Sequence, residues 1–198
     1  MKKTKVEKTA EASLPTKYGK FEIMVFKSNL DKRNQVVLVN GKIKKTPVLV
    51  RLHSKCLTGD VFSSLRCDCR KQLELGLEKI AKNGGVLIYL NQEGRNIGLE
   101  NKIKAYALQE AGDDTVVANL DLGLPIDARE YVVAALILKY LKIKQIKLLT
   151  NNNDKIDKLE KEGIKVVKRI SLETKPNKYN KFYLETKKIK MGHRLKKV

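Results

Sequence analysis

The sequence predicts a mixed α+β or α/β fold in a single domain, with N-terminal antiparallel strands packed beside alternating helices and strands. Three observations support this fold class. The first quarter of the chain alternates apolar and polar residues with the period of two that is typical of half-buried strands. Residues 70–170 alternate between helical stripes and short apolar runs, the pattern of an α/β layer. The chain has 198 residues, 42% of them hydrophobic, which is enough for one well-formed core.

The N-terminal part is expected to form antiparallel sheet after a tail. Residues 1–13 contain few apolar side chains and are expected to be a disordered basic tail. Residues 21–25 alternate as a strand does, and residues 36–39 predict a second strand. Asn40-Gly41 then predicts a tight hairpin turn, with the return strand at 47–53.

Helices and strands are expected to alternate along the rest of the chain. Apolar spacing, glycines at helix ends and polar residues at helix starts set their bounds. In order, they are a helix over 70–83, a strand over 86–90, a loop over 91–98, a helix through Leu108, a helix from about Asp127 to Leu141, a strand over 146–149, a helix from 151–153 to Gly163 and a strand at 166–167. The remaining residues are polar and basic and predict no clear element, and residues 196–198 form a short basic tail.

No segment has the sequence of a membrane span or a secretion signal. The longest apolar run, 132–138, is far shorter than the roughly 18 residues that span a bilayer. The basic N-terminus is not followed by the apolar run of a signal peptide. We therefore expect a soluble, cytoplasmic protein with no membrane partner.

The net charge of +20 first suggests a nucleic-acid-binding protein. The excess lies at the two ends, with +8 in residues 1–50 and +9 in 151–198, against +3 in 51–150. Lysine supplies most of the basic residues, yet the nearly neutral middle holds most of the arginines: Arg51, Arg66, Arg70, Arg95 and Arg129. Arginine there indicates bidentate binding of phosphate or carboxylate, with a chance distribution as the alternative.

All three cysteines, Cys56, Cys67 and Cys69, lie in one short window. An odd number of thiols in a cytoplasmic protein favours a metal site over disulfides. Three thiolates would leave the fourth position of a tetrahedral zinc ion open, as in catalytic zinc sites; His53 could instead fill it and close the site. The alternative is three ordinary buried thiols.

Three polar loops have both a binding and a purely structural interpretation. The glycine-containing loop 92–98, between a strand and a helix, could present backbone N–H groups to an anion or be a tight turn. Asp127 could cap a helix, act as a catalyst or do both, and Arg129 in the predicted first turn opposes the helix dipole. The loop 150–155 follows a strand, where ligands bind in α/β sheets, although helix capping explains the same residues.

Taken together, six motifs resemble GTP cyclohydrolase II of riboflavin synthesis. They follow in order from about residue 14 to 195, which marks 14–195 as the catalytic domain. The motifs are Arg51 to Asp60 (RLHSKCLTGD), Leu65 to Cys69 (LRCDC), Gln92 to Leu99 (QEGRNIGL), Lys104 to Gln109 (KAYALQ), Leu148 to Asn152 (LLTNN) and Lys190 to His193 (KMGH).

The resemblance implies a zinc-dependent hydrolase that opens the imidazole ring of GTP. It would release formate and pyrophosphate and give 2,5-diamino-6-ribosylamino-pyrimidinone 5'-phosphate. By this resemblance Cys56, Cys67 and Cys69 bind Zn²⁺, Tyr106 acts near the ring, Asp127 is the general base, and Arg129 acts at the α-phosphate. Because guanidinium stays protonated, charge stabilisation is the safer role for Arg129.

The resemblance also implies the nucleotide contacts, Mg²⁺ with the triphosphate and a homodimer. The expected substrate-binding residues are Arg51, Leu52, His53, Ser54, Lys55, Gln72, Glu93, Gly94, Arg95, Thr115, Thr150 and Lys155.

Lys55 and Arg70 depart from the family's motifs, in which glutamate and glycine are usual. These cations beside metal ligands leave open a paralogue with altered or lost catalysis. A zinc-containing nucleic-acid-binding protein is a further alternative, but nucleic acid is not the expected partner, since seven tyrosines, four phenylalanines and no tryptophan offer few stacking groups.

Overall fold

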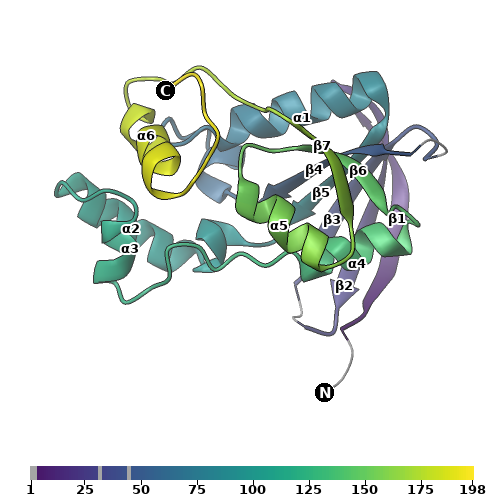
Figure 1. The fold of residues 1–198 in the computed structure, drawn as a ribbon, viewed down its shortest axis with the longest axis horizontal. Coiled ribbons are helices and arrows are strands. Elements are labelled where there is room, and N and C mark those ends of the chain that lie inside the picture. The colour runs from purple at the N-terminus through teal and green to yellow at the C-terminus, as the bar shows by residue number, and fades with distance from the viewer. Residues whose placement is uncertain (1–3, 31–32, 44–45) are drawn as a thin grey trace. The chain divides into compact units, whose positions relative to one another are not determined.

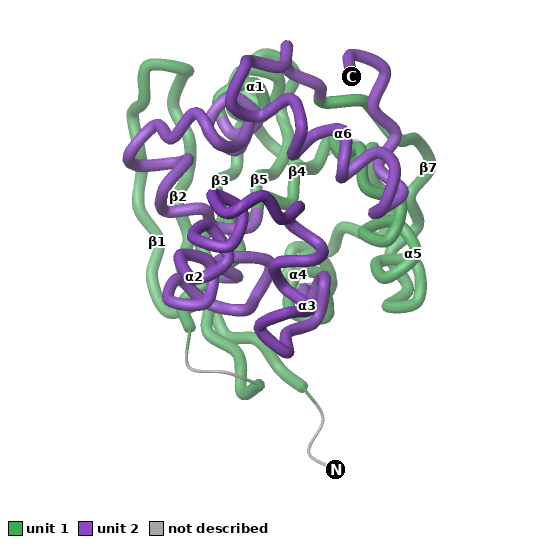
Figure 2. Tube along the Cα trace, turned by 90° about the vertical axis from the view of Figure 1, so that its left-hand side faces the viewer, with its two compact units in different colours: residues 1–53, 74–91, 130–172 green, residues 54–73, 92–129, 173–198 purple. Residues whose placement is uncertain are grey.

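The computed structural model describes residues 4–30, 33–43 and 46–198. The chain divides into two compact units, each assembled from three chain segments (Figure 2). The first unit holds residues 1–53, 74–91 and 130–172, and the second unit holds residues 54–73, 92–129 and 173–198. No sequence pattern predicts this division, because neither unit is continuous along the chain.

A single seven-stranded mixed sheet forms the frame of the first unit (Figure 1). Its strands are β1 (Val6–Thr16), β2 (Gly19–Ser28), β3 (Gln35–Asn40), β4 (Val48–Ser54), β5 (Gly85–Leu90), β6 (Gln145–Leu149) and β7 (Lys165–Ile170). They lie in the order β1-β2-β3-β5-β4-β6-β7. Strands β1, β2, β3 and β5 pair antiparallel, whereas β4, β6 and β7 pair parallel. The predicted mixed fold class is therefore confirmed.

Helices cover both faces of this sheet. Helices α4 (Val132–Tyr140) and α5 (Asn153–Lys161) share one apolar core with alternate residues of the strands, such as Val37 and Val39 of β3. On the opposite face lies α1 (Cys69–Asn83), whose Gly76 packs against the side chains of Arg51 and Leu87. The period of two in the strands thus supplies an apolar surface to each helical layer.

The second unit consists of short helical elements joined by loops. They are the π-helical turn η1 (Leu57–Val61), the 3-10 turn η2 (Glu93–Asn96) and the helices α2 (Leu99–Glu110), α3 (Val117–Asp121) and α6 (Lys181–Lys190). Helix α6 lies in the polar, basic C-terminal stretch, where the sequence predicts no clear element. In the part of the chain that the structure describes, no helix has the length and apolar character needed to cross a membrane.

The expected disordered tail over residues 1–13 is wrong for residues 6–13, which belong to β1. This strand pairs with β2 from Val6 opposite Ser28 to Thr16 opposite Gly19, with one irregularity between Lys8 and Ala10. It lies at the edge of the sheet and most of its residues are exposed, so backbone pairing holds a segment with few apolar side chains. Residues 1–3 of the predicted tail lie outside the described residues.

The hairpin predicted at Asn40-Gly41 is also wrong. Strand β3 pairs with β2 and β5, and β5 lies between β3 and β4. Five of the six residues of β5 are buried. This apolar strand occupies the position between β3 and β4, whereas a hairpin would have made β3 and β4 direct neighbours. Residues 44–45 of the connection lie outside the described residues.

The helix predicted to start near Asp127 begins at Val132. Asp127 is not its N-cap, because its Oδ1 accepts a hydrogen bond from the backbone N–H of Arg129 at 3.1 Å, in a turn before the helix. The capping-box interpretation of Asp127 and Glu130 is therefore wrong. By contrast, the start predicted for the helix at 151–153 is confirmed, since Asn152 caps α5 by accepting from Asp154 N at 3.0 Å.

Candidate functional site

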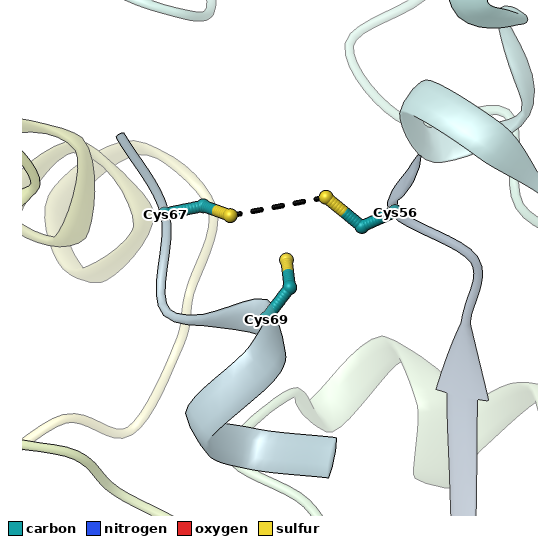
Figure 3. A group of neighbouring side chains, drawn as sticks. All are labelled: Cys56, Cys67 and Cys69. Atoms are coloured by element: carbon teal, nitrogen blue, oxygen red, sulfur yellow. Dashed lines mark hydrogen bonds between the residues drawn. The ribbon is translucent and has the colours of Figure 1, made fainter. Parts of the chain in front are cut away.

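The three cysteine sulfurs converge in the second unit. The sulfurs all lie within 4.8 Å of one another, and Cys56 Sγ is 3.8 Å from Cys67 Sγ. Figure 3 shows the three side chains pointing toward a common centre, with Cys56 beyond the end of β4, Cys67 in a loop and Cys69 at the start of α1. The clustering expected from the sequence spacing is therefore observed.

The turn after Cys56 holds this arrangement. Cys56 N donates to Asp60 Oδ2 at 3.0 Å, and Asp60 N donates to Cys56 O at 2.7 Å. Gly59, inside the turn, faces the sulfurs: a Cβ at this position would lie 2.7 Å from Cys67 Sγ and 3.1 Å from Cys56 Sγ. Only glycine fits there without displacing a sulfur.

The donor set fits a zinc ion. Three soft sulfur ligands in one small space are typical of zinc sites, and a metal-binding cysteine is a thiolate. Contacts with the other two thiols lower the pKa of Cys56, whereas contact with Cys56 raises the pKa of Cys67 to about 11 and raises that of Cys69 as well. Without a metal the cluster therefore favours one thiolate, and full ionisation needs an added cation.

No histidine belongs to this ligand group among the described residues. His53, the alternative fourth ligand in the sequence analysis, is a buried member of the first unit and stacks on the ring of Tyr89, with centroids 5.5 Å apart. Thr150, also in the first unit, is buried, and its Oγ1 accepts from Asn152 N at 3.1 Å.

A buried lysine adjoins the sulfur cluster. Lys102 Nζ lies 3.2 Å from Cys56 Sγ and 2.7 Å from Glu93 Oε1, and both charged side chains are about nine-tenths buried. Glu93 Oε2 accepts from Leu57 N at 2.7 Å. Burial opposes the charge of Lys102, but the nearby Cys56 thiolate and Glu93 raise its pKa above the ordinary value. Glu93, predicted from the resemblance to bind substrate, is thus engaged with the cysteine turn.

Tyr106 is linked to the same cluster through Thr58. Its hydroxyl lies 3.3 Å from Thr58 Oγ1, which is 3.7 Å from Cys56 Sγ. Burial raises the pKa of Tyr106 to about 12, so its phenol is protonated at neutral pH. The guanidinium of Arg66 lies 4.5 Å from the ring centroid. Tyr106 therefore presents a fixed hydroxyl near the sulfurs.

Asp127 and Arg129 form a two-pronged ion pair in the second unit. Arg129 Nε donates to Asp127 Oδ1 at 2.8 Å, and Arg129 Nη2 contacts Oδ2. Burial alone would raise the pKa of Asp127, but the bonds from Arg129 and the charge of Arg95 leave that pKa below its ordinary value. Asp127 is therefore an ionised carboxylate at neutral pH.

The loop around Arg95 is fastened to the segment that carries Asp127. Arg95 O accepts from Ala128 N at 3.1 Å, and Arg95 Nη1 donates to Ile126 O at 3.3 Å. Gly94, Arg95 and Asn96 all have positive φ, so the loop is held in a conformation that non-glycine residues rarely adopt. Arg95 Nη2 is buried and has no hydrogen-bond partner within the described parts of the chain. It is a donor available to an anion.

Two predicted substrate-binding cations hydrogen-bond to backbone carbonyls of the first unit. Arg51 Nη1 donates to Leu149 O at 2.9 Å, and Lys155 Nζ donates to Leu52 O at 2.8 Å. The bond of Arg51 connects β4 to its parallel neighbour β6, and the bond of Lys155 connects α5 to β4. Both lie near the carboxyl ends of these strands, the edge at which α/β sheets bind ligands.

The predicted substrate-binding residues are divided between the units. Those in the first unit are Arg51, Leu52, His53, Thr150 and Lys155. Those in the second unit are Ser54, Lys55, Gln72, Glu93, Gly94, Arg95 and Thr115. Within the second unit, Gln72 Nε2 donates to Asp68 Oδ2 at 2.5 Å, Thr115 is buried and Lys55 is partly exposed. Arg70 donates to Asp60 O at 3.2 Å and to Ser63 Oγ at 3.0 Å, so it holds the cysteine turn.

Sequence reasoning missed two lysines near the cysteines. Lys102 precedes Tyr106 by four residues on α2, and this spacing on one helix face was the available signal. Lys187 of α6 lies 3.5 Å from Asp68, the residue between two cysteines, and no sequence pattern connects these distant positions.

Known proteins similar to this chain include a GTP cyclohydrolase-2 and proteins named for riboflavin biosynthesis. A family model described as GTP cyclohydrolase II matches residues 7–171. A GTP cyclohydrolase-2 from Picrophilus torridus is 50% identical and aligns over 95% of this chain and 98% of its own length. A riboflavin biosynthesis protein RibBA from Aquifex aeolicus is 55% identical over 97% of this chain, and one from Chlorobium phaeovibrioides is 50% identical over 95%.

The chain spans about half the length of these RibBA relatives, 48% and 46% respectively. One similar solved structure is that of RibBX, a two-domain 3,4-dihydroxy-2-butanone 4-phosphate synthase from A. baumannii. The alignment covers 74% of this chain and 34% of the RibBX chain, at 20% identity and a TM-score of 0.40.

Proposed function

Since the chain belongs to the GTP cyclohydrolase II family, we propose that it is a zinc-dependent hydrolase that opens the imidazole ring of GTP. The products are formate, pyrophosphate and 2,5-diamino-6-ribosylamino-pyrimidinone 5'-phosphate, and the reaction is the first step of riboflavin synthesis. The observation that carries this proposal is the convergence of Cys56, Cys67 and Cys69. That donor set suits a catalytic metal, because three protein ligands leave one coordination position for the reaction.

The metal would be held by the three cysteine sulfurs, in the space that Gly59 leaves open. When bound, zinc supplies Lewis-acid activation of water for attack on the ring carbon between the two imidazole nitrogens. Tyr106 keeps its proton because its pKa is raised to about 12, so it donates a hydrogen bond toward the purine ring rather than acting as a base. Thr58 fixes the direction of that hydroxyl.

Asp127 and Arg129 act as a pair. The carboxylate of Asp127 is ionised and serves as the base that accepts a proton, and the attached guanidinium keeps it oriented. Arg129 remains protonated beside this carboxylate, so it stabilises negative charge at the α-phosphate and is not the nucleophile.

The proposed nucleotide contacts are the twelve residues predicted from the resemblance. The unpartnered, buried Nη2 of Arg95 supports an anion-binding role for its loop. Mg²⁺ enters as the counter-ion of the triphosphate and is part of the substrate. We also propose a cytoplasmic homodimer, on the resemblance alone.

Product analysis tests this function. Zinc-loaded protein incubated with GTP and Mg²⁺ is expected to yield formate and pyrophosphate in equal amounts, with the pyrimidinone identified by mass spectrometry. Cys67→Ser is expected to lose zinc and ring opening together, because one of three metal ligands is removed. Folded, zinc-loaded protein that releases neither product contradicts the proposal, and full zinc occupancy in Cys67→Ser contradicts the ligand assignment.

A further inference from the structure

Resting on the proposed function, we infer that Lys102 is a positioning residue of the metal centre: its ammonium group holds Cys56 and Glu93 together and balances the charge of the thiolates. Lys102 contacts a proposed metal ligand directly, at 3.2 Å from Cys56 Sγ. It acts through that sulfur and is not itself a ligand.

The contacts of Lys102 form a closed network around the cysteine turn. Its Nζ donates to Cys56 Sγ and, at 2.7 Å, to Glu93 Oε1. The other oxygen of Glu93 accepts from Leu57 N at 2.7 Å. Leu57 directly follows Cys56, so the lysine and the glutamate hold both the side chain of this ligand and the backbone beside it.

The charge balance of the metal centre depends on the position of the Lys102 ammonium group. Three thiolates carry three negative charges and zinc supplies two positive ones, and the carboxylate of Glu93 adds another negative charge nearby. Lys102 lies between Glu93 and the nearest thiolate, and its side chain is 10% exposed, so water screens this interaction weakly. Without Lys102, two buried negative groups would face each other.

The side chain of Lys102 passes close to Gly94, where a larger residue would be crowded. A Cβ at Gly94 would lie 3.1 Å from Lys102 Cβ and 3.2 Å from Ile97 Cγ1. Gly94 therefore leaves room for the side chain that reaches Cys56. The glycine-containing loop thus contributes to the metal centre as well as to the proposed nucleotide site.

An N–H···S bond to Cys56 has a chemical consequence that the other two sulfurs do not share. A hydrogen bond to a thiolate withdraws charge from that sulfur, so the bonded sulfur differs electronically from an unbonded one as a metal ligand. Among the three cysteines, only Cys56 is in hydrogen-bond contact with Lys102 in the described chain. The three sulfurs are therefore inequivalent ligands. A change at one of them is expected to shift the sulfur-to-metal charge-transfer band of bound Co²⁺.

Four variants of the whole chain test this role: Lys102→Met, Glu93→Gln, the double variant, and Lys104→Met as the matched control. Lys104 lies on the same helix but is exposed and pairs with Glu100. Zinc affinity is measured by competition with a chromophoric chelator, and the sulfur-to-metal charge-transfer band is recorded with Co²⁺. Circular dichroism confirms that each variant is folded.

Lys102→Met is expected to weaken zinc binding by about 10- to 100-fold, the usual cost of removing an outer-shell partner, and to shift the Co²⁺ band. Lys104→Met is expected to match the wild type. The double variant removes both buried charges together, so we expect it to fold even if Lys102→Met alone does not. Its zinc affinity is expected to be as weak as that of Lys102→Met, and its Co²⁺ band to be shifted in the same way. Glu93→Gln leaves Lys102 in contact with Cys56, so it is expected to lose less zinc affinity than Lys102→Met.

Two results would overturn the inference. One is wild-type affinity and an unshifted band in Lys102→Met; the other is recovery of both in the double variant, which would mean that Lys102 only neutralises Glu93. Wild-type protein that binds no zinc would instead refute the proposed function, and the inference with it. The same preparation therefore separates the two failures.

Discussion

Asp127 and Arg129 form a forked ion pair, and this pairing limits the roles that each residue can take in the proposed reaction. Arg129 Nε lies 2.8 and 3.1 Å from the two oxygens of Asp127, a forked geometry that lysine could not reproduce. The pair stabilises the ionised carboxylate and the protonated guanidinium at once. A neutral arginine nucleophile would have to break this interaction first, which is why charge stabilisation is the role we assign to Arg129.

Replacing Asp127 by asparagine is expected to destabilise the protein at pH 7 by about 1–3 kcal/mol, because Arg129 loses a partly buried, charged hydrogen-bond partner. The pKa of Asp127 is below its ordinary value, so its contribution is fully present above the unfolded-state pKa of about 3.9. It is lost as the pH falls through the lower folded-state pKa. Urea unfolding of Asp127→Asn and wild type at a series of pH values measures this difference, which should narrow below about pH 4.

Glu130→Gln is the control for this measurement, since Glu130 is largely exposed and its replacement should change stability by no more than about 0.5 kcal/mol. A difference between Asp127→Asn and wild type that stays constant with pH would show that the carboxylate is not stabilised in the folded state.

Sequence reasoning was most successful where spacing alone limits the chemistry. Three cysteines in a short window predicted a cluster, and the structure brings their sulfurs within 4.8 Å. Lys102 was not found, because the chain is rich in exposed lysines and the burial of this one depends on Glu93, a partner that only the folded loop supplies. The roles of the individual site residues stay predictions until the variants are measured.

Helix α6, which the sequence does not predict, contacts the segment that carries two of the cysteines. Its Lys187 lies 3.5 Å from Asp68 Oδ1 and 4.2 Å from the centre of the Tyr183 ring. Burial alone would lower the pKa of Lys187, but Tyr183 and Asp68 raise it above the ordinary value. Asp68 separates Cys67 from Cys69, so the helix is tied to the loop that presents two of the sulfurs.

Lys187→Met is expected to lower the free energy of unfolding by about 1–3 kcal/mol, because Asp68 is 3% exposed and loses its cationic partner. Lys188→Met, at an exposed position on the same helix, should lie within about 0.5 kcal/mol of wild type. Denaturant unfolding of the metal-free proteins makes this comparison. Equal stability of the two variants would mean that the ion pair contributes nothing to the loop.

The strands were easier to predict than their neighbours. Apolar runs located β3, β4, β5 and β6, because each must bury side chains on the sheet. The hairpin between β3 and β4 failed because strand pairing is not local: β5, nearly 50 residues after β3, pairs with it over Val36 to Asn40. Helix α6 lies in a stretch with many lysines and no clear start or stop signal, so the sequence predicts no element there.

For the molecule as a whole, the net charge of +20 invites the interpretation as a nucleic-acid-binding protein. A protein of that class with six to ten phosphate contacts loses about 10³–10⁵ in affinity between about 50 and 200 mM salt. We expect only weak association with duplex DNA at physiological salt, as measured by fluorescence anisotropy, because the excess positive charge lies at the two ends of the chain and few aromatic side chains are available for stacking. Tight binding that falls steeply with salt would favour the nucleic-acid interpretation instead.

The interleaving of the two units limits how such a chain can be divided or recombined. Both units are drawn from alternating stretches, with changes of unit after residues 53, 73, 91, 129 and 172. A single genetic crossover anywhere between these points would split at least one unit between two parents. Exchange between relatives is therefore expected to succeed only where the parents already agree closely, and neither unit can be inherited as a separate module.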